Sequence, residues 1–469
     1  MYVHTGRNKN CFQGRRALNN LQKSLKKKLV VHFSETELDA VARATEFKIR
    51  KSKITPVMFV DTILFQELDN ATISLEDHCI SLKQRYDVTI KKQSLAERFD
   101  ATAVGFIQQL LNRQLSDQIS STLEKEKLGS VFQHFSSVKI KDSTRFQVPE
   151  CFKEYYPGST GASTGAGVHI QFEFDILNGK VNDLTVSDAL RQDSTDAQET
   201  MDGIEKGSLI IRDLGYFSTR VLEHVHQQEA YYITRTKSRM IFTHAQSGKN
   251  IDFDAVYWKM KRNKLSHMEL PVIIGDKKLR SRLIAEMLPE EEVDKRLAKA
   301  NKEAEKKGRK VSDEFKSRAR LNLFLTNVPA EWLSPLQIRK IYQIRWQIEL
   351  RFKAWKSFYD ISAIKKMQRY RFECYLYATL LLLMINLEIA ANFFSILWKH
   401  TSKPLSFLKF YKTTSQNIAV LRQGILGGGD NLINYITFLY EVSHEKLLTE
   451  KRKNHSGPLI EILNQNLVS

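Results

Sequence analysis

The chain has few of the residues that build disulfide frameworks and zinc sites. Its 469 residues include only four cysteines, and these are far apart: Cys11, Cys79, Cys151 and Cys374. No CxxC pair and no Cys/His spacing typical of zinc ligands occurs. The composition argues against both kinds of site and favours a reducing, cytoplasmic compartment.

A secretory signal and a P-loop are also missing, although short stretches of the sequence are similar to each. The first 33 residues hold eight Lys or Arg and no acid, but no apolar core follows, so a secretory signal is not predicted. The glycine-rich segment from Gly158 to Gly167 lacks the Gly-Lys-Ser/Thr of a P-loop. This excludes a nucleotide-triphosphate site of that type.

One apolar run, Tyr375 to Trp398, is long enough to span a bilayer. Three polar residues interrupt it, and no second run of this kind exists: Asn386, Glu388 and Asn392. We therefore expect a buried helix or a dimer interface, and no membrane partner. A membrane-associated protein is kept as an alternative.

The charge balance is strongly positive. Lys and Arg total 72 against 53 Asp and Glu, giving a formal net charge of +19 and an isoelectric point near 9.5. Such an excess attracts polyanions, either nucleic acid or an anionic membrane surface. The length predicts two to four domains.

The stretch from Ser334 to Asp360 is predicted to be one long helix. Ser334 is a suitable N-cap, Pro335 suits the first helical position, and no later proline or glycine interrupts the stretch. At about 100° per residue, four polar side chains fall within an arc of roughly 60°: Tyr342, Arg345, Glu349 and Lys356. This face could handle phosphate, or it could be an ordinary solvated face with an Arg–Glu pair.

Two aspartates upstream follow apolar strand patterns. Asp142 continues the alternation of Val138 and Ile140 at the end of a candidate strand, where it could equally cap a turn. Asp213 follows the continuous apolar run 209–211, which is typical of a central strand covered on both faces. Charged residues just past buried strands are where α/β proteins place ligand chemistry.

The spacing Tyr342-x2-Arg345-x3-Glu349-x6-Lys356 is the Y-R-E-K signature of the IS-four family of bacterial insertion-sequence transposases. The chain resembles this family over roughly residues 131–370. The segments starting at Asp142 (Asp-Ser-Thr) and at Asp213 (Asp-Leu-Gly-Tyr-Phe) are similar to its two aspartate boxes.

The resemblance implies a DDE transposase and assigns roles to six residues. The catalytic and metal-binding residues, which would hold two Mg²⁺ (or Mn²⁺) ions, would be Asp142, Asp213 and Glu349. The residues that hold DNA phosphates would be Tyr342, Arg345 and Lys356. Three carboxylates suit hard divalent cations, which prefer oxygen ligands.

The implied reaction is metal-dependent cleavage of double-stranded DNA at terminal inverted repeats, followed by strand transfer to target DNA. A homodimer in the synaptic complex and a cytoplasmic protein, nucleoid-associated when bound to DNA, are expected. Two other functions stay open: a catalytically silent transposase-derived DNA-binding regulator, and a structure-specific nuclease on the same fold.

The fold class is α/β, and the resemblance together with the element order implies an RNase H-like core with a mixed five-stranded sheet. An insertion, first β-rich and then helical, would interrupt the core. The expected regions are a helical DNA-binding region at 1–130, the core at 131–235 and 321–370, the insertion at 236–320, and a helical C-terminal region at 371–469.

Two local predictions concern the regions around the core. Ile90 to Phe99 and the helix from Ala103 resemble a helix-turn-helix, or a plain pair of helices. In the insertion, Trp258 could stack on a displaced base, although a core tryptophan is the favoured interpretation.

Overall fold

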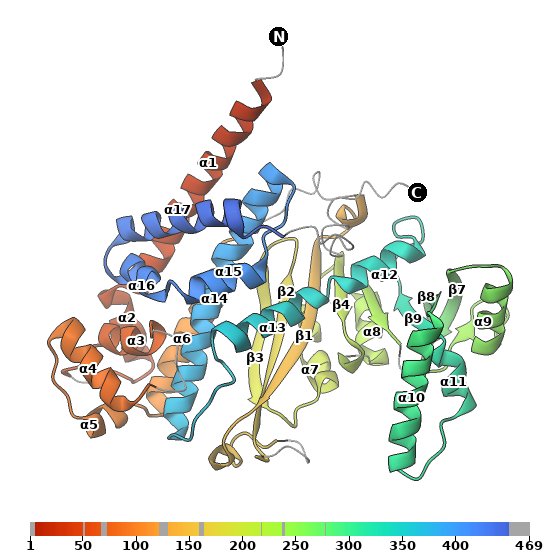
Figure 1. Cartoon of the computed structure of the whole chain (residues 1–469), viewed down its shortest axis with the longest axis horizontal. Coiled ribbons are helices and arrows are strands. Elements are labelled where there is room, and N and C mark those ends of the chain that lie inside the picture. Colours follow the sequence, from red (N-terminus) through yellow and green to blue (C-terminus); the bar gives the residue numbers. More distant parts are fainter. Residues whose placement is uncertain are drawn as a thin grey trace.

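The structure is a computed structural model that describes residues 5–49, 52–66, 73–121, 130–158, 164–216, 218–236, 240–276 and 278–449. Phe217 of the second aspartate box and residues 159–163 of the glycine-rich segment lie outside the described residues. The described part is a mixed α/β structure with one large sheet and many helices (Figure 1).

The sheet contains nine strands within the described residues, in the order β3-β2-β1-β4-β5-β9-β8-β7-β6. Strands β1, β4 and β5 are parallel to one another, and the other neighbours are antiparallel. The strands are β1 Ser137–Gln147, β2 Gly167–Asp175, β3 Lys180–Asp188, β4 Ser208–Arg212, β5 Tyr231–Arg235, β6 Thr243–His244, β7 His267–Ile274, β8 Leu279–Met287 and β9 Leu321–Thr326.

The α-helices fall into three groups along the chain. The N-terminal helices are α1 Thr5–Leu25, α2 Glu35–Ala44, α3 Pro56–Leu64, α4 Leu75–Tyr86, α5 Lys92–Ala96 and α6 Ala101–Ser116. Those between the strands are α7 Asp193–Glu199, α8 Thr219–Gln227, α9 Phe253–Arg262, α10 Glu290–Lys306 and α11 Asp313–Ala319. The last group is α12 Pro335–Gln343, α13 Trp346–Phe358, α14 Arg369–Thr401, α15 Phe407–Ser415, α16 Ile418–Leu426 and α17 Gly429–Lys446.

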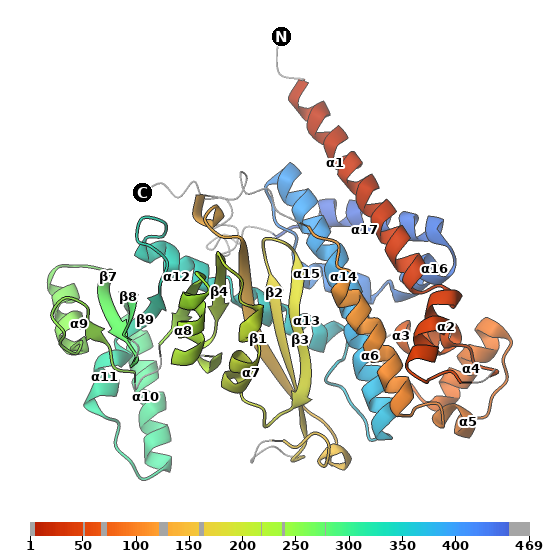
Figure 2. The same cartoon turned by 180° about the vertical axis from the view of Figure 1, so that it is seen from behind.

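Each face of the sheet has its own hydrophobic core, because side chains alternate along a strand. On β4, Leu209 and Ile211 belong to the core shared with α12 and α13, whereas Ile210 belongs to the core shared with α8. Figures 1 and 2 show α12 and α13 crossing one face and α7 and α8 covering the other. The apolar run of β4 is therefore buried on both sides, as its sequence predicts.

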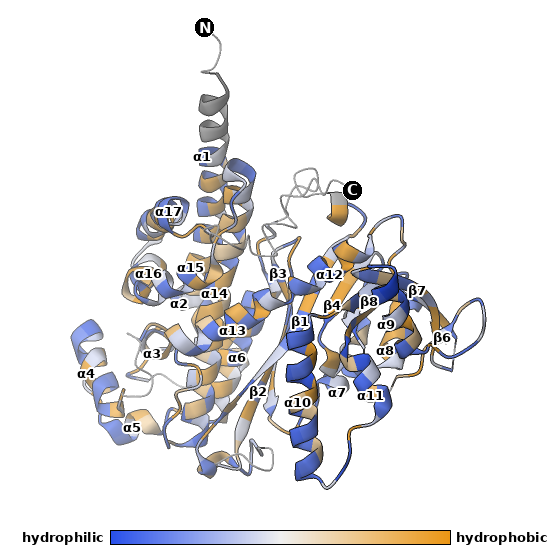
Figure 3. Ribbon diagram, turned by 45° about the vertical axis from the view of Figure 1, so that its right-hand side comes forward, coloured by the Kyte–Doolittle hydropathy of each residue, from blue (hydrophilic) through white to orange (hydrophobic). Residues whose placement is uncertain are grey.

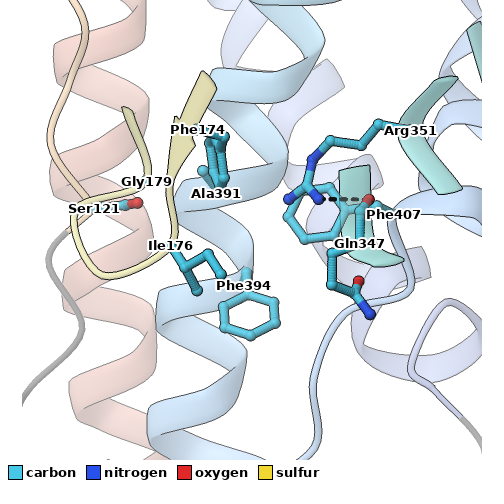
Figure 4. Close-up of a pocket in the computed structure, with 9 residues that line it drawn as sticks. All are labelled: Ser121, Phe174, Ile176, Gly179, Gln347, Arg351, Ala391, Phe394 and Phe407. Carbon is cyan, nitrogen blue, oxygen red and sulfur yellow. Dashed lines mark hydrogen bonds between the residues drawn. The ribbon is translucent and has the colours of Figure 1, made fainter. Parts of the chain in front are cut away.

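Helix α13 is fixed to the sheet through Trp355, whose fully buried ring lies 5.1 Å from the Phe172 ring on β2. Arg351 lies deeper than a charged residue usually does, with 2% of its surface exposed. Its guanidinium is 4.5 Å from the Phe174 ring and 4.1 Å from the Phe407 ring, and Nη1 donates to the Gln347 carbonyl at 2.8 Å (Figure 4). These contacts join α13 to β2 and α15.

The first and last thirds of the chain pack together beside β3 (Figures 1 and 2). Buried polar contacts connect them: Lys28 Nζ and Gln114 Nε2 lie 2.9 and 2.7 Å from the Glu388 carboxylate on α14. Arg422 of α16 forms an ion pair with the fully buried Asp61 of α3. Glu388 thus interrupts the apolar run to anchor the N-terminal helices.

The apolar run forms α14, which is long and hydrophobic enough to span a membrane by length and composition alone (Figure 3). In the structure, 89% of its most hydrophobic 18-residue window is buried inside the chain. The prediction of a buried helix at this position is confirmed.

The structure differs from the sequence-based expectations at several points. The sheet continues beyond five strands, because β9 pairs with both β5 and β8 and so joins β6–β8 to the same sheet. The single long helix is two helices, α12 and α13. The first half of the insertion, expected to be β-rich, contains the helix α9, with Asp252 as its N-cap. Trp258 on α9 is 52% exposed, so the interpretation as a core tryptophan is wrong.

Candidate active site

The parallel pairing of β1 and β4 ends just before the two aspartates, which follow side by side. The last paired residues of β1 and β4 are Lys141 and Arg212, so Asp142 and Asp213 follow at the next position of the register. Asp142 was expected at the end of a strand, but β1 continues past it to Gln147 through its pairing with β2. Asp142 therefore lies in mid-strand, at the point where its parallel neighbour turns away.

The connection between α12 and α13 places the third carboxylate over this position. Ile344, Arg345, Gln347 and Ile348 donate their backbone N–H groups to carbonyls three residues earlier, at 2.9–3.2 Å. This tighter 3₁₀-like turn ends α12 without a proline or glycine, so the sequence carries no signal for it. The backbone stays helical at Ile344 and Arg345, and the polar stripe continues to Glu349.

Arg345 connects two of the carboxylates. Its Nη1 donates to Asp142 Oδ2, and its Nη2 donates to Glu349 Oε1 at 2.6 Å. The hydroxyl of Tyr342 donates to Asp213 Oδ1 at 3.0 Å. Five of the six residues singled out in the sequence therefore form one cluster of contacts between the sheet and the α12–α13 junction.

The cluster concentrates negative charge in a partly desolvated place. Burial raises the pKa of Asp142 to about 6, with further upward contributions from Asp213 and Glu349 that Arg345 only partly offsets. Burial alone would lower the pKa of Arg345, but the surrounding acidic groups, Asp142 foremost, outweigh burial and raise it. The three carboxylates thus interact electrostatically and favour a positive charge among them.

Lys356 stands apart from this cluster. It is seven residues beyond Glu349, about 10 Å further along α13, and its Nζ donates to the Arg145 carbonyl of β1 at 3.0 Å. Burial lowers the pKa of its ammonium group. The lysine flanks the carboxylates on the β1 side and does not contact them through any described hydrogen bond.

Comparison with known proteins identifies the protein family. The sequence matches the family "Transposase DDE domain" over residues 133–385, more than half of the chain. The chain belongs to the DDE transposase family. The transposase for insertion sequence element IS231F of Bacillus thuringiensis subsp. israelensis is 30% identical, covering 83% of this chain and 84% of that protein.

Two further relatives match over most of their length. The transposase for IS231B of Bacillus thuringiensis subsp. berliner is 28% identical over 90% of this chain and 91% of that protein. The transposase for IS1151 of Clostridium perfringens is 26% identical over 88% and 90%. The chain is thus an insertion-sequence DNA transposase, an enzyme that cleaves and joins DNA strands.

Asp193 of this transposase, the first residue of α7, was not singled out in the sequence. Its Oδ1 accepts hydrogen bonds from Ser143 Oγ and Gln171 Nε2, both at 2.9 Å, and lies 3.2 Å from His169 Nε2. Burial would raise the pKa of Asp193, but hydrogen bonds, those from His169 and Gln171 foremost, outweigh burial and lower it to about 2.

This carboxylate braces both aspartate-bearing segments. Ser143 directly follows Asp142, and a Cβ atom on Gly215, two residues past Asp213, would come within 2.9 Å of Asp193 Oδ2. Asp193 therefore packs against both segments from behind. No spacing rule or periodicity marks such a residue, because its partners come together only when β1, β2 and β4 are assembled.

The family generally uses divalent metal ions, and the donor set of the transposase suits them. Three carboxylates whose mutual repulsion helps to raise the pKa of Asp142 match the oxygen preference of Mg²⁺ and Mn²⁺. In the described residues, Arg345 supplies the positive charge at Asp142 and Glu349, and no three His, Cys, Asp or Glu side chains form a metal-binding group. Binding of ions would require Arg345 to release these carboxylates.

Proposed function

We propose that Asp142, Asp213 and Glu349 are the catalytic carboxylates of this transposase and hold two divalent ions, Mg²⁺ or Mn²⁺. The observation that carries the proposal is the register of β1 and β4, which sets both aspartates in one row beneath the residue pair Arg345 and Glu349. Bound ions would activate the attacking oxygen and neutralise the leaving oxygen of a phosphodiester.

The strand order supports an RNase H-like core. Strands β3, β2 and β1 are antiparallel neighbours, followed by parallel β4 and β5. This order supports the mixed five-stranded sheet that the resemblance implies. In this proposal the core spans 131–235 and 321–370. Residues 236–320 are an insertion that widens the sheet, and the regions 1–130 and 371–469 supply DNA binding and dimer contacts.

The remaining residues of the signature would act on DNA. Arg345 can exchange its two carboxylate partners for phosphate oxygens, since a guanidinium binds either group with the same pair of N–H donors. Tyr342 would orient Asp213 and present its hydroxyl beside the cleaved phosphodiester. Lys356 would contact a phosphate on the β1 side.

The partners proposed on this basis are the terminal inverted repeats of the element and the target DNA. Synapsis of two ends would be carried out by a homodimer. A cytoplasmic location, with binding to the nucleoid through DNA, fits the excess of Lys and Arg, which total 72, over Asp and Glu, which total 53.

A strand-transfer assay tests the proposed reaction. A duplex from the end of the element that encodes the chain, labelled and pre-cleaved to expose its 3′-hydroxyl, is incubated with wild-type protein, a target plasmid and Mg²⁺. Joining of the label to the plasmid is expected, and Asp213→Asn should abolish it without loss of binding. If the protein cleaves an uncut duplex of the same end but does not join the pre-cleaved one, a nuclease is favoured. Binding with neither activity would favour a silent regulator.

A further inference from the structure

A pocket of about 310 Å³ lies beside the candidate active site, between β5, β9 and the helices α10 and α11. Leu214, the residue after Asp213, forms one wall. Among the described residues, three arginines from three different elements line the pocket, and no acidic residue does: Arg235 of β5, Arg296 of α10 and Arg318 of α11. Such a pocket is suited to an anion.

The three arginines are not equally available. Arg318 lies 2.9 Å from Glu314 and donates to the Met240 carbonyl at 2.6 Å, so its charge is already compensated. Arg296 donates to neutral oxygens, the Asn322 side chain at 2.6 Å and the Leu321 carbonyl at 3.3 Å. Neither Arg235 nor Arg296 forms an ion pair within the described part of the chain.

The two arginines that lack an ion pair also repel each other. Burial lowers the pKa of Arg296, the nearby positive charge of Arg235 lowers it further, and the carboxylates of Glu292 and Glu286 offset this only in part. Two like charges held together at a half-buried position cost free energy unless an anion joins them. Glu286 and Glu292 act on Arg296 from outside the pocket, and none of the described lining residues carries a negative charge.

The sheet register relates this pair to the carboxylates. Arg212 pairs with Thr234 across β4 and β5, so Arg235 follows at the same level as Asp213, just as Asp213 follows at the level of Asp142. Neighbouring strands are about 4.8 Å apart. Asp142, Asp213 and Arg235 therefore form one row across three parallel strands, at the level where β4 and β5 end. Lys356 lies at the β1 side of that row.

We propose that Arg235 and Arg296 form a phosphate-binding subsite that holds a DNA phosphodiester neighbouring the cleaved one, on the β5 side of Asp213. Together with Lys356 on the β1 side, the subsite would fix the strand on both sides of the carboxylates. The proposal rests on the proposed catalytic role of those carboxylates. It assigns a DNA-contacting function to Arg296, a residue of the inserted helix α10.

Salt dependence of binding provides the first test. The full chain binds a labelled duplex from the end of its element at several salt concentrations, without a requirement for cleavage. The variants are Arg296→Gln, Arg296→Lys and, as a control, Lys302→Gln, which removes the same charge from an exposed position on α10. Loss of one phosphate contact should reduce the slope of log K against log salt by about 0.9.

The expected result is a reduced slope for Arg296→Gln, a slope close to wild type for Arg296→Lys, and no comparable change for Lys302→Gln. Equal slopes for Arg296→Gln and wild type would overturn the proposal. If Arg296→Gln does not fold, Arg235→Gln provides the same measurement from the other side of the pocket. Rescue by lysine separates a phosphate contact from a merely structural role, because lysine keeps the charge without the planar donor pair.

Single neutral methylphosphonate linkages provide the second test. In the wild type, one linkage next to the cleavage position should weaken binding about tenfold or more, as expected for loss of a charged hydrogen bond. In Arg296→Gln the same linkage should have little further effect. The neutral linkage is placed in the element's end in one experiment and in the target duplex in another. The comparison shows which DNA supplies the phosphate.

If no linkage loses its effect in the variant, the subsite does not exist. Failure of the catalytic proposal would look different. It would appear as normal cleavage by Glu349→Gln. The salt slope of Arg296→Gln would still be lower than that of the wild type.

Discussion

Replacing Asp193 with asparagine isolates the charge of the residue that braces both aspartate-bearing segments. Asparagine has nearly the same shape and can still accept from Ser143 Oγ and Gln171 Nε2, which lie 2.9 Å from Asp193 Oδ1. It cannot provide a negative charge for these donors or for His169. The substitution should therefore destabilise the fold without creating a cavity.

The pKa of Asp193 sets the expected magnitude. A carboxyl whose pKa is about 2 in the folded chain, against an ordinary value of 3.8, contributes about 2 kcal/mol at neutral pH, since each pKa unit is worth about 1.4 kcal/mol. Because 20% of the side chain remains exposed, we expect about 1–2 kcal/mol. The folded pKa is the lower one, so this contribution is present above pH 4 and disappears as the pH falls towards 2.

The assay is urea unfolding followed by intrinsic fluorescence at pH 7 and pH 3. The control is Glu199→Gln, which removes a charge from the other end of α7, where a 55% exposed carboxylate pairs with Arg191. An exposed ion pair is worth about 0–1 kcal/mol. Asp193→Asn should cost more than the control at pH 7, and the difference should shrink at pH 3.

Two results would refute this reasoning. A free-energy loss no larger than that of Glu199→Gln at pH 7 would mean that the buried hydrogen bonds do not need the charge. A loss that stays the same at pH 3 would mean that asparagine disturbs the packing and that the low pKa is not the cause.

Three further predictions concern the site and its helix. Since the pKa of Asp142 is about 6, protons should compete with the metal there, so the Mg²⁺ concentration for half-maximal cleavage should fall from pH 5 to pH 7; a flat profile would contradict this. Lys356→Ala should reduce the salt slope of DNA binding by about 0.9, and an unchanged slope would argue against a phosphate contact. Arg351→Ala should lower the free energy of unfolding by about 3–5 kcal/mol, as for other large buried side chains, whereas Arg351→Met should cost less than about 1.5 kcal/mol; equal losses in urea unfolding would assign the effect to the charge.

Local sequence patterns predicted most of the strands and helices near the site. The run 209–211 lies in the central strand β4, buried on both faces as its sequence predicts. Ser334 is the N-cap of α12 and Pro335 its first residue, as predicted. These predictions succeeded because each depends on a few adjacent residues.

Features that depend on assembly could not be read in the same way. The break at Ile344 arises from a tightened turn without proline or glycine, and the widening of the sheet depends on β9 pairing with both β5 and β8. The helix α9 lies in the half of the insertion that was expected to be β-rich, although Asp252 and the spacing of Phe253, Val256 and Met260 are a helical signal. The roles of Asp193 and Arg296 follow only from contacts between distant segments.

Glu349 and the two aspartates are proposed to form a metal-dependent cleavage site. The most direct measurement is cleavage of a labelled duplex carrying the end of the element, with Mg²⁺ or with EDTA. It compares wild type, Glu349→Gln and the exposed control Glu331→Gln. We predict Mg²⁺-dependent nicking by wild type and the control, and binding without nicking by Glu349→Gln. Nicking by Glu349→Gln at the wild-type rate would contradict the account.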